Sequence, residues 1–226
     1  MVKIGFLLRT KGKDIKSQQL TEVEHIGQGR LGIGPEFSTQ NFMADDNKQK
    51  PIFTIGHSTH PISEFIGILQ SFSISVVADI RNFPGSKRYP HFNKENLEAS
   101  LEKNNISYIH IKDLGGRRKP VANSANTRWR NAAFRGYADY MSSAPFVQAV
   151  SELEELASRE NLAYMCAEAV WWSCHRSLIS DYLKIRGWAV FNIMGLGKAS
   201  EHPFTSAARI IEGELRYNDP GLFEQE

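Results

Sequence analysis

From Pro51 onwards, short apolar runs alternate with amphipathic stretches along the chain. Five of these runs have the length and the β-branched or aromatic content of strands, and they span residues 52–55, 75–80, 108–111, 162–167 and 188–193. Between them, apolar residues recur at helical spacing, and residues that favour helix starts precede three segments: Pro61, Asn93 and Pro145. Several of the strand runs are apolar without alternation, which predicts a sheet that is covered on both faces.

Strands that alternate with helices in this way are typical of an α/β domain. The pattern predicts three layers, with helices on both faces of a mostly parallel sheet of about five strands. A small C-terminal hairpin is expected near residues 209–217. Residues 1–50 show neither the period of 2 that is typical of strands nor the period of 3.6 that is typical of helices. They are predicted to be a disordered or loosely packed N-terminal extension. The domain is then expected to cover 51–217, and residues 218–226 form a tail.

The composition is that of an ordinary globular protein, with 41% hydrophobic and 23% charged residues, and the net charge of +2 points to no particular partner. Lysine and arginine are nevertheless concentrated between Lys112 and Arg135, where Asp113 is the one acid. Such a segment can hold an anionic ligand. We find no apolar run of transmembrane length, no signal peptide and no secreted disulfide pattern, so we expect a cytoplasmic protein that does not associate with membranes.

Polar side chains follow the first four predicted strands at the point where each strand ends. They are His57 and Ser58, Asp79 and Arg81, His110 and Lys112, and Cys166 and Glu168. The carboxyl ends of parallel strands meet at one edge of a sheet, where ligands bind, so these side chains are expected to lie together.

The fourth strand leads through a turn with Trp171 and Trp172 into Cys174, His175 and Arg176, which begin a helix. A helix N-terminus favours an anion or a thiolate. This strand-to-helix junction is therefore the predicted centre of the site.

Structural roles compete with functional ones at several of these positions. Cys166 lies in an apolar run and is more typical of a core residue, whereas Cys174 is better placed for a lowered pKa. Asp79 and Arg81 can form a purely structural ion pair. Glu168 is the position where a function is most strongly indicated, because an acid after a buried strand is costly unless it is paired.

Several phrases of the sequence occur in a recognisable order. They are GHSTHPISEF, VVADIRNFPGSKRYPHFN, LGGRRKP, WRNAAFRGYADYM and MCAEAVWWSCHRSLISDYL. With them, the chain resembles the DUF488 family from about Ile52 to Tyr217. The family pattern centres on CAE and CHR, carried here by residues 166–168 and 174–176, with a GHS turn at 56–58 and an acid-x-Arg at Asp79 and Arg81. The resemblance supports the fold and the site and implies no particular reaction.

The leading hypothesis is an enzyme, a hydrolase or group transferase, that acts on an anionic small molecule, nucleotide-like compound or nucleic acid. Glu168 or Asp79 would serve as nucleophile or general base, with His175 or His57 moving the proton. The predicted substrate-binding residues are His57, Ser58, Arg81, Arg117, Arg118, Trp172 and Arg176. Neither GxGxxG nor GxxxxGK[ST] is present, so the sequence supports neither dinucleotide nor P-loop binding, and the cofactor stays unknown.

Three alternatives remain open. The first is a cysteine-dependent thiol, redox or sulfur-transfer protein, with Cys174 as thiolate and Cys166 as its resolving partner. The second is a metal site formed by Cys166, Cys174, His175 and His57, but this spacing matches no standard zinc pattern and no metal is predicted. The third is a non-catalytic nucleic-acid-binding module built on the basic segment that contains Arg117, Arg118, Lys119, Arg128, Trp129, Arg130 and Arg135.

Overall fold

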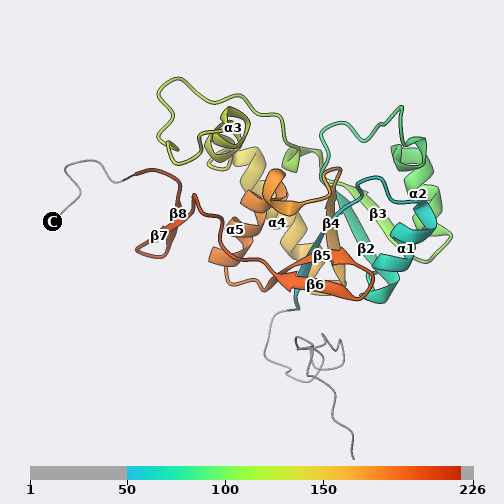
Figure 1. Ribbon diagram of the computed structural model, residues 1–226. Coiled ribbons are helices and arrows are strands. Elements are labelled where there is room, and N and C mark those ends of the chain that lie inside the picture. Colours follow the sequence, from blue (N-terminus) through green and yellow to red (C-terminus); the bar gives the residue numbers. More distant parts are fainter. Residues whose placement is uncertain (1–49, 220–226) are drawn as a thin grey trace, which may run out of the picture. The chain divides into compact units, whose positions relative to one another are not determined.

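The computed structural model describes residues 50–219, which form a six-stranded sheet with helices on both faces (Figure 1). The predictions for an N-terminal extension and for most of the tail lie outside these residues. The strands of the sheet are β1 (Ile52–Gly56), β2 (Val76–Asp79), β3 (Ser107–His110), β4 (Leu162–Cys166), β5 (Val190–Gly195) and β6 (Lys198–Glu201). Their order is β3-β2-β4-β1-β5-β6; the first five in this order are parallel and β6 is antiparallel to β5.

The helices cover the two faces unequally. They are α1 (Ile62–Ser71), α2 (Lys94–Glu102), α3 (Ala132–Tyr140), α4 (Ala144–Arg159) and α5 (Arg176–Ile185). Alternate residues of β4 show the division: Ala163 and Met165 pack with α1 and α2, whereas Tyr164 and Cys166 pack with α3, α4 and α5. The predicted three-layer α/β fold is confirmed.

The order of the strands places a topological switch point between the neighbouring strands β1 and β4. After β1 the chain continues into α1, which covers one face of the sheet. After β4 it continues into α5, which covers the other face. Two neighbouring strands whose connections run to opposite faces define a topological switch point, and ligands bind there at the carboxyl edge of the sheet.

The C-terminal part confirms the predicted hairpin, formed by β7 (Arg209–Ile211) and β8 (Glu214–Arg216). A buried polar cluster around Asp181 of α5 ties this region to the domain. Its carboxylate accepts hydrogen bonds from the Thr205 hydroxyl and from Tyr217 Oη at 3.0 Å, and it lies 3.1 Å from His202 Nε2. The cluster is a structural anchor for the segment after β6.

Two elements were not predicted, so the sheet has one strand more than expected. β6 has the sequence KASE, which is short and largely exposed, and an edge strand of this kind carries no apolar pattern. Helix α3 contains Gly136 and few aliphatic residues. Its start is stabilised by the Asn131 side chain, which accepts hydrogen bonds from the backbone N–H groups of Ala133 and Phe134.

Candidate functional site

A pocket of about 810 Å³ opens at the carboxyl edge of the sheet, beside the β1–β4 switch point. Loops from four strands contribute to it, together with the start of α3. Its lining includes His57 and Ser58 after β1, Arg81 and Asn82 after β2, Gly116 and Arg117 after β3, and residues 166–169 at the end of β4. Cys174 and His175, just before α5, complete the lining.

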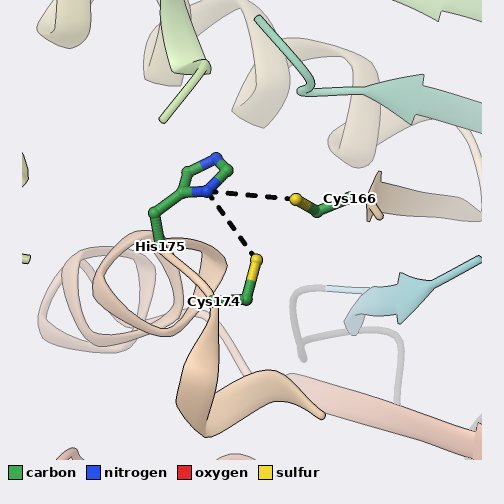
Figure 2. Close-up of side chains that lie close together, drawn as sticks. All are labelled: Cys166, Cys174 and His175. Atoms are coloured by element: carbon green, nitrogen blue, oxygen red, sulfur yellow. Dashed lines mark hydrogen bonds between the residues drawn. The ribbon is translucent and has the colours of Figure 1, made fainter. Parts of the chain in front are cut away.

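Two thiols and one imidazole converge in this pocket (Figure 2). Nδ1 of His175 lies 3.7 Å from Sγ of Cys174 and 3.9 Å from Sγ of Cys166, and the three atoms lie within 4.8 Å of one another. Both cysteines are free and buried. We call Cys166, Cys174 and His175 the thiol–imidazole cluster.

Backbone geometry explains how neighbouring residues both reach the cluster. Cys174 is extended, with φ −126° and ψ 143°, whereas His175 is already helical, with φ −56° and ψ −19°. This change of conformation aims both side chains at the end of β4. Gly116 leaves the space that the imidazole needs, because a Cβ at this position would lie 2.8 Å from Nδ1 of His175.

The two thiols have opposite pKa shifts. A hydrogen bond from Cys174 lowers the pKa of Cys166 well below its usual value, and His175 and Arg176 lower it further. The same hydrogen bond, with burial, raises the pKa of Cys174. The prediction that Cys174 carries the lowered pKa is therefore wrong: the lowered pKa belongs to Cys166, and the pKa of Cys174 is raised.

Arg176 lies behind the pocket, with only 2% of its surface exposed, and is not part of the pocket lining. Its Nη2 donates to the carbonyl of Ala169 at 2.9 Å, while Nε and Nη1 have no hydrogen-bond partner within residues 50–219. The guanidinium occupies the space above Gly56, where a Cβ would lie 2.5 Å from Nη1. Arg176, the last residue of the CHR motif, thus packs against Gly56 of the GHS motif. Its positive charge lies near Cys166.

A second buried network connects the ends of β1 and β2. Asp79 is fully buried and accepts from Arg81 Nε at 2.9 Å and from Tyr108 Oη at 2.8 Å. Nη1 of Arg81 lies 3.2 Å from Nε2 of His57, so Nε2 accepts and the ring proton sits on Nδ1, which donates to the Ser58 carbonyl. Burial, and then the charge of Arg81, lower the pKa of His57 to about 4.

This network has consequences for the predicted roles. Asp79 does not line the pocket and its carboxylate is already engaged, so the geometry favours a supporting position in which it orients Arg81. His57 is held neutral with both ring nitrogens occupied. Arg81 lines the pocket despite its ion pair with Asp79.

Glu168 and the basic segment differ from expectation. Glu168 lines the pocket but is exposed, so the expectation that it is buried and therefore paired is wrong. Arg117 lines the pocket, whereas Arg118 is outside it and stacks over the ring of Tyr140, 3.7 Å from the centroid.

The tryptophans also lie apart from the main pocket. Trp171 is partly buried and packs edge-on against His202, with ring centroids 4.8 Å apart. Trp172 is 55% exposed and borders a separate small hollow with Val170 and Met194. The structure therefore places neither tryptophan against the thiol–imidazole cluster.

Several residues of the pocket lining are not among those predicted from the sequence. Asn82, Phe83, Arg88 and Tyr89 come from the long loop after β2, and Phe134 comes from the start of α3. The loop could have been found, because it follows the carboxyl end of a predicted strand. Phe134 could not, because α3 itself was not predicted.

The fold and the site define an α/β domain with a pocket containing cysteine, histidine and arginine at the carboxyl edge of a parallel sheet. The sequence profile of the family described as "Domain of unknown function DUF488" matches residues 61–183, and the chain belongs to this family. The matched part contains both CAE and CHR motifs, and the GHS turn lies just before it. No curated protein and no solved structure gives a significant match. Within residues 50–219, every helix is too short or too polar to cross a membrane.

Proposed function

We propose that the protein is a hydrolase or group transferase that acts on an anionic substrate, with Cys166 as the nucleophile. The observation that carries this proposal is the position of Cys166 Sγ. It lies in the pocket at the carboxyl edge of the sheet, beside a second thiol and an imidazole. A thiolate in such surroundings is a strong nucleophile.

The charges in the pocket favour an anion. Arg81, Arg88 and Arg117 line it, and Glu168 is the one acid in its lining. Arginine offers planar, paired donors that suit phosphate and carboxylate groups. Phe83, Tyr89 and Phe134 also line the pocket and provide faces for a planar ring, so a nucleotide-like substrate or a nucleic-acid end fits this lining.

The chemistry follows from the positions of the groups. The Cys166 thiolate attacks the electrophilic centre, and the bond to the leaving group breaks as the new bond to sulfur forms. The leaving group takes a proton from the Cys174 thiol or from the His175 imidazole, the two proton carriers next to Cys166. Water or an acceptor then attacks the covalent intermediate, and the bond to sulfur breaks to release the thiolate. The proton of the attacking group passes by way of Glu168 at the rim back to the group that protonated the leaving group, which restores the site.

Thiol redox or sulfur-transfer chemistry would use the same pair of cysteines, and it is the second candidate because Cys174 lies next to Cys166. The non-catalytic nucleic-acid-binding module has less support. Arg128 is bound to the carbonyls of Ser206 and Ala207, and Arg118 is stacked on Tyr140. Part of the basic segment therefore serves the fold.

The test combines a substrate panel with paired variants. Nucleotides, sugar phosphates and short single-stranded oligonucleotides are incubated with wild-type protein, Cys166→Ser and Cys174→Ser, and both turnover and covalent adducts are measured by mass spectrometry. We expect Cys166→Ser to abolish turnover and adduct formation, and Cys174→Ser to slow turnover while the adduct persists. Full turnover by Cys166→Ser would refute the assignment.

Neighbouring arginines provide a matched control for substrate binding. Arg117 lines the pocket and Arg118 does not. We therefore expect Arg117→Gln to weaken binding of the anionic substrate and Arg118→Gln to leave it unchanged, as measured by the ligand-induced shift in melting temperature. Equal effects of the two substitutions would contradict the proposed orientation of the substrate.

A further inference from the structure

The thiol–imidazole cluster has the composition of a binding site for a soft divalent cation. Thiolate and imidazole are the ligands that Zn²⁺ takes most often in proteins. We propose that Cys166, Cys174 and His175 bind one Zn²⁺ ion, with the fourth coordination position facing the pocket.

The distances fit this assignment. A tetrahedral Zn²⁺ with ordinary bond lengths holds a sulfur and a nitrogen about 3.6 Å apart. Nδ1 of His175 lies 3.7 Å and 3.9 Å from the two sulfurs, and all three atoms lie within 4.8 Å of one another. Closure onto the ion therefore requires movements of a few tenths of an ångström for the imidazole.

The cluster is held by rigid parts of the fold. Cys166 ends the central strand β4, and Cys174 and His175 come directly before α5. Adjacent residues seldom supply two ligands to one ion, but the change from extended to helical backbone between Cys174 and His175 turns both side chains to the same side. This local backbone geometry allows the two adjacent residues to bind the same ion.

Neighbouring groups determine what completes the coordination. His57 is not the fourth ligand, because Arg81 and the Ser58 carbonyl occupy its two ring nitrogens. All three cluster residues line the pocket, so the remaining position is open to water or to an incoming anion. Two thiolates neutralise the ion, and the positive charges of Arg81 and Arg176 nearby favour an anion as the fourth ligand.

This inference goes beyond the proposed function and does not depend on it. If both hold, bound Zn²⁺ uses the sulfur lone pair of Cys166 that would attack the substrate, and the metal inhibits the thiol reaction. The zinc proposal and the proposed catalytic function can fail separately. Metal binding is measured by absorption spectroscopy, whereas turnover is measured with a chelator present, which keeps the protein free of metal.

The experiment titrates the full-length, reduced and metal-free protein with Co²⁺, and then displaces Co²⁺ with Zn²⁺. We expect one equivalent of Co²⁺ to produce thiolate-to-cobalt charge-transfer absorption in the ultraviolet and tetrahedral d–d bands in the visible, and one equivalent of Zn²⁺ to remove both. Cys166→Ser and Cys174→Ser should lose the charge-transfer band or most of its intensity. Ser173→Ala, a change at an exposed neighbour of the cluster, should keep the wild-type spectrum.

A second measurement keeps the proposal testable if the cysteine variants fold poorly. Iodoacetamide labelling of wild-type protein is followed by mass spectrometry with and without one equivalent of Zn²⁺. We expect Zn²⁺ to protect Cys166 and Cys174 together, and a chelator to restore labelling. Absence of the charge-transfer band, or labelling of both thiols that Zn²⁺ does not slow, would overturn the proposal.

Discussion

Gly56, the last residue of β1, offers a quantitative test of how the site is assembled. A Cβ at this position would overlap the carbonyl oxygen of Glu168 and would lie 2.7 Å from its carbonyl carbon and 2.5 Å from Nη1 of Arg176. Ordinary contacts of a Cβ are 3.4–4 Å. Gly56→Ala therefore cannot be accommodated without displacing the loop after β4 and the buried guanidinium.

The size of the effect follows from the neighbours that must move. Overpacking a well-packed site typically costs about 1–3 kcal/mol, and backbone and buried charge yield less readily than a flexible side chain, so we expect a loss of about 3 kcal/mol or more. For a domain of this size, such a loss lowers the melting temperature by about 6–12 °C.

The chain contains a matched control for the same chemical change. Gly67 lies inside α1, and a Cβ there would meet nothing within 4 Å. Alanine is a better helix former than glycine, so Gly67→Ala should stabilise the protein by roughly 0.5–1 kcal/mol.

Urea unfolding followed by circular dichroism measures both variants under the same conditions. The expected result is opposite signs, with free energies of unfolding that differ by about 4 kcal/mol. If Gly56→Ala is as stable as the wild type, or if both variants shift equally, the close approach of β1 to the loop after β4 is not as described.

Three further predictions concern the residues around the pocket. Asp79→Asn leaves Arg81 as a buried charge without its carboxylate, so the free energy of unfolding should fall by about 3–5 kcal/mol in urea titrations; a loss below about 1 kcal/mol would show that the pair is solvated. His57 has a pKa of about 4 in the folded protein against 6.5 when unfolded, so the unfolded state takes up the proton first. Stability should therefore be complete above pH 6.5 and decline by up to about 3 kcal/mol as the pH falls through 4, and His57→Gln should decline less over this range; equal slopes would contradict the assignment. Glu168→Gln changes an exposed residue, so the melting point should barely move, with less than about 0.5 kcal/mol of change, while turnover falls; a large loss of stability would show that Glu168 supports the fold instead.

Much of the fold could be predicted from the sequence because strands and helices have characteristic short-range patterns of apolar and polar residues. The run at 162–167 corresponds to β4 at Leu162–Cys166, and the run at 75–80 corresponds to β2 at Val76–Asp79. The parallel direction of these strands then placed His57, Arg81 and Cys166 at one edge, where the pocket lies. Edge strand β6 has no such apolar pattern, because its side chains are largely exposed and contact little of the core.

For the site, the sequence predicted which edge of the sheet carries it, but not which side chains face the pocket. Residues that follow a strand end are near the pocket, but whether they face it depends on the backbone of the loop and on what packs behind it. Arg117 enters the pocket and Arg118 turns to Tyr140, although they are neighbours in sequence. Glu168 is exposed and Arg176 is buried for the same kind of reason.

The amino-acid sequence by itself determined the α/β class, the strand polarity and the edge where the polar groups gather, since these depend on residue type and short-range periodicity. Only the tertiary structure decided that β1 lies next to β4 and that Cys166 rather than Cys174 carries the lowered pKa. Strand order and thiol acidity both arise from contacts between segments distant in sequence, and the burial and charges of those contacts are absent from any short stretch of the chain.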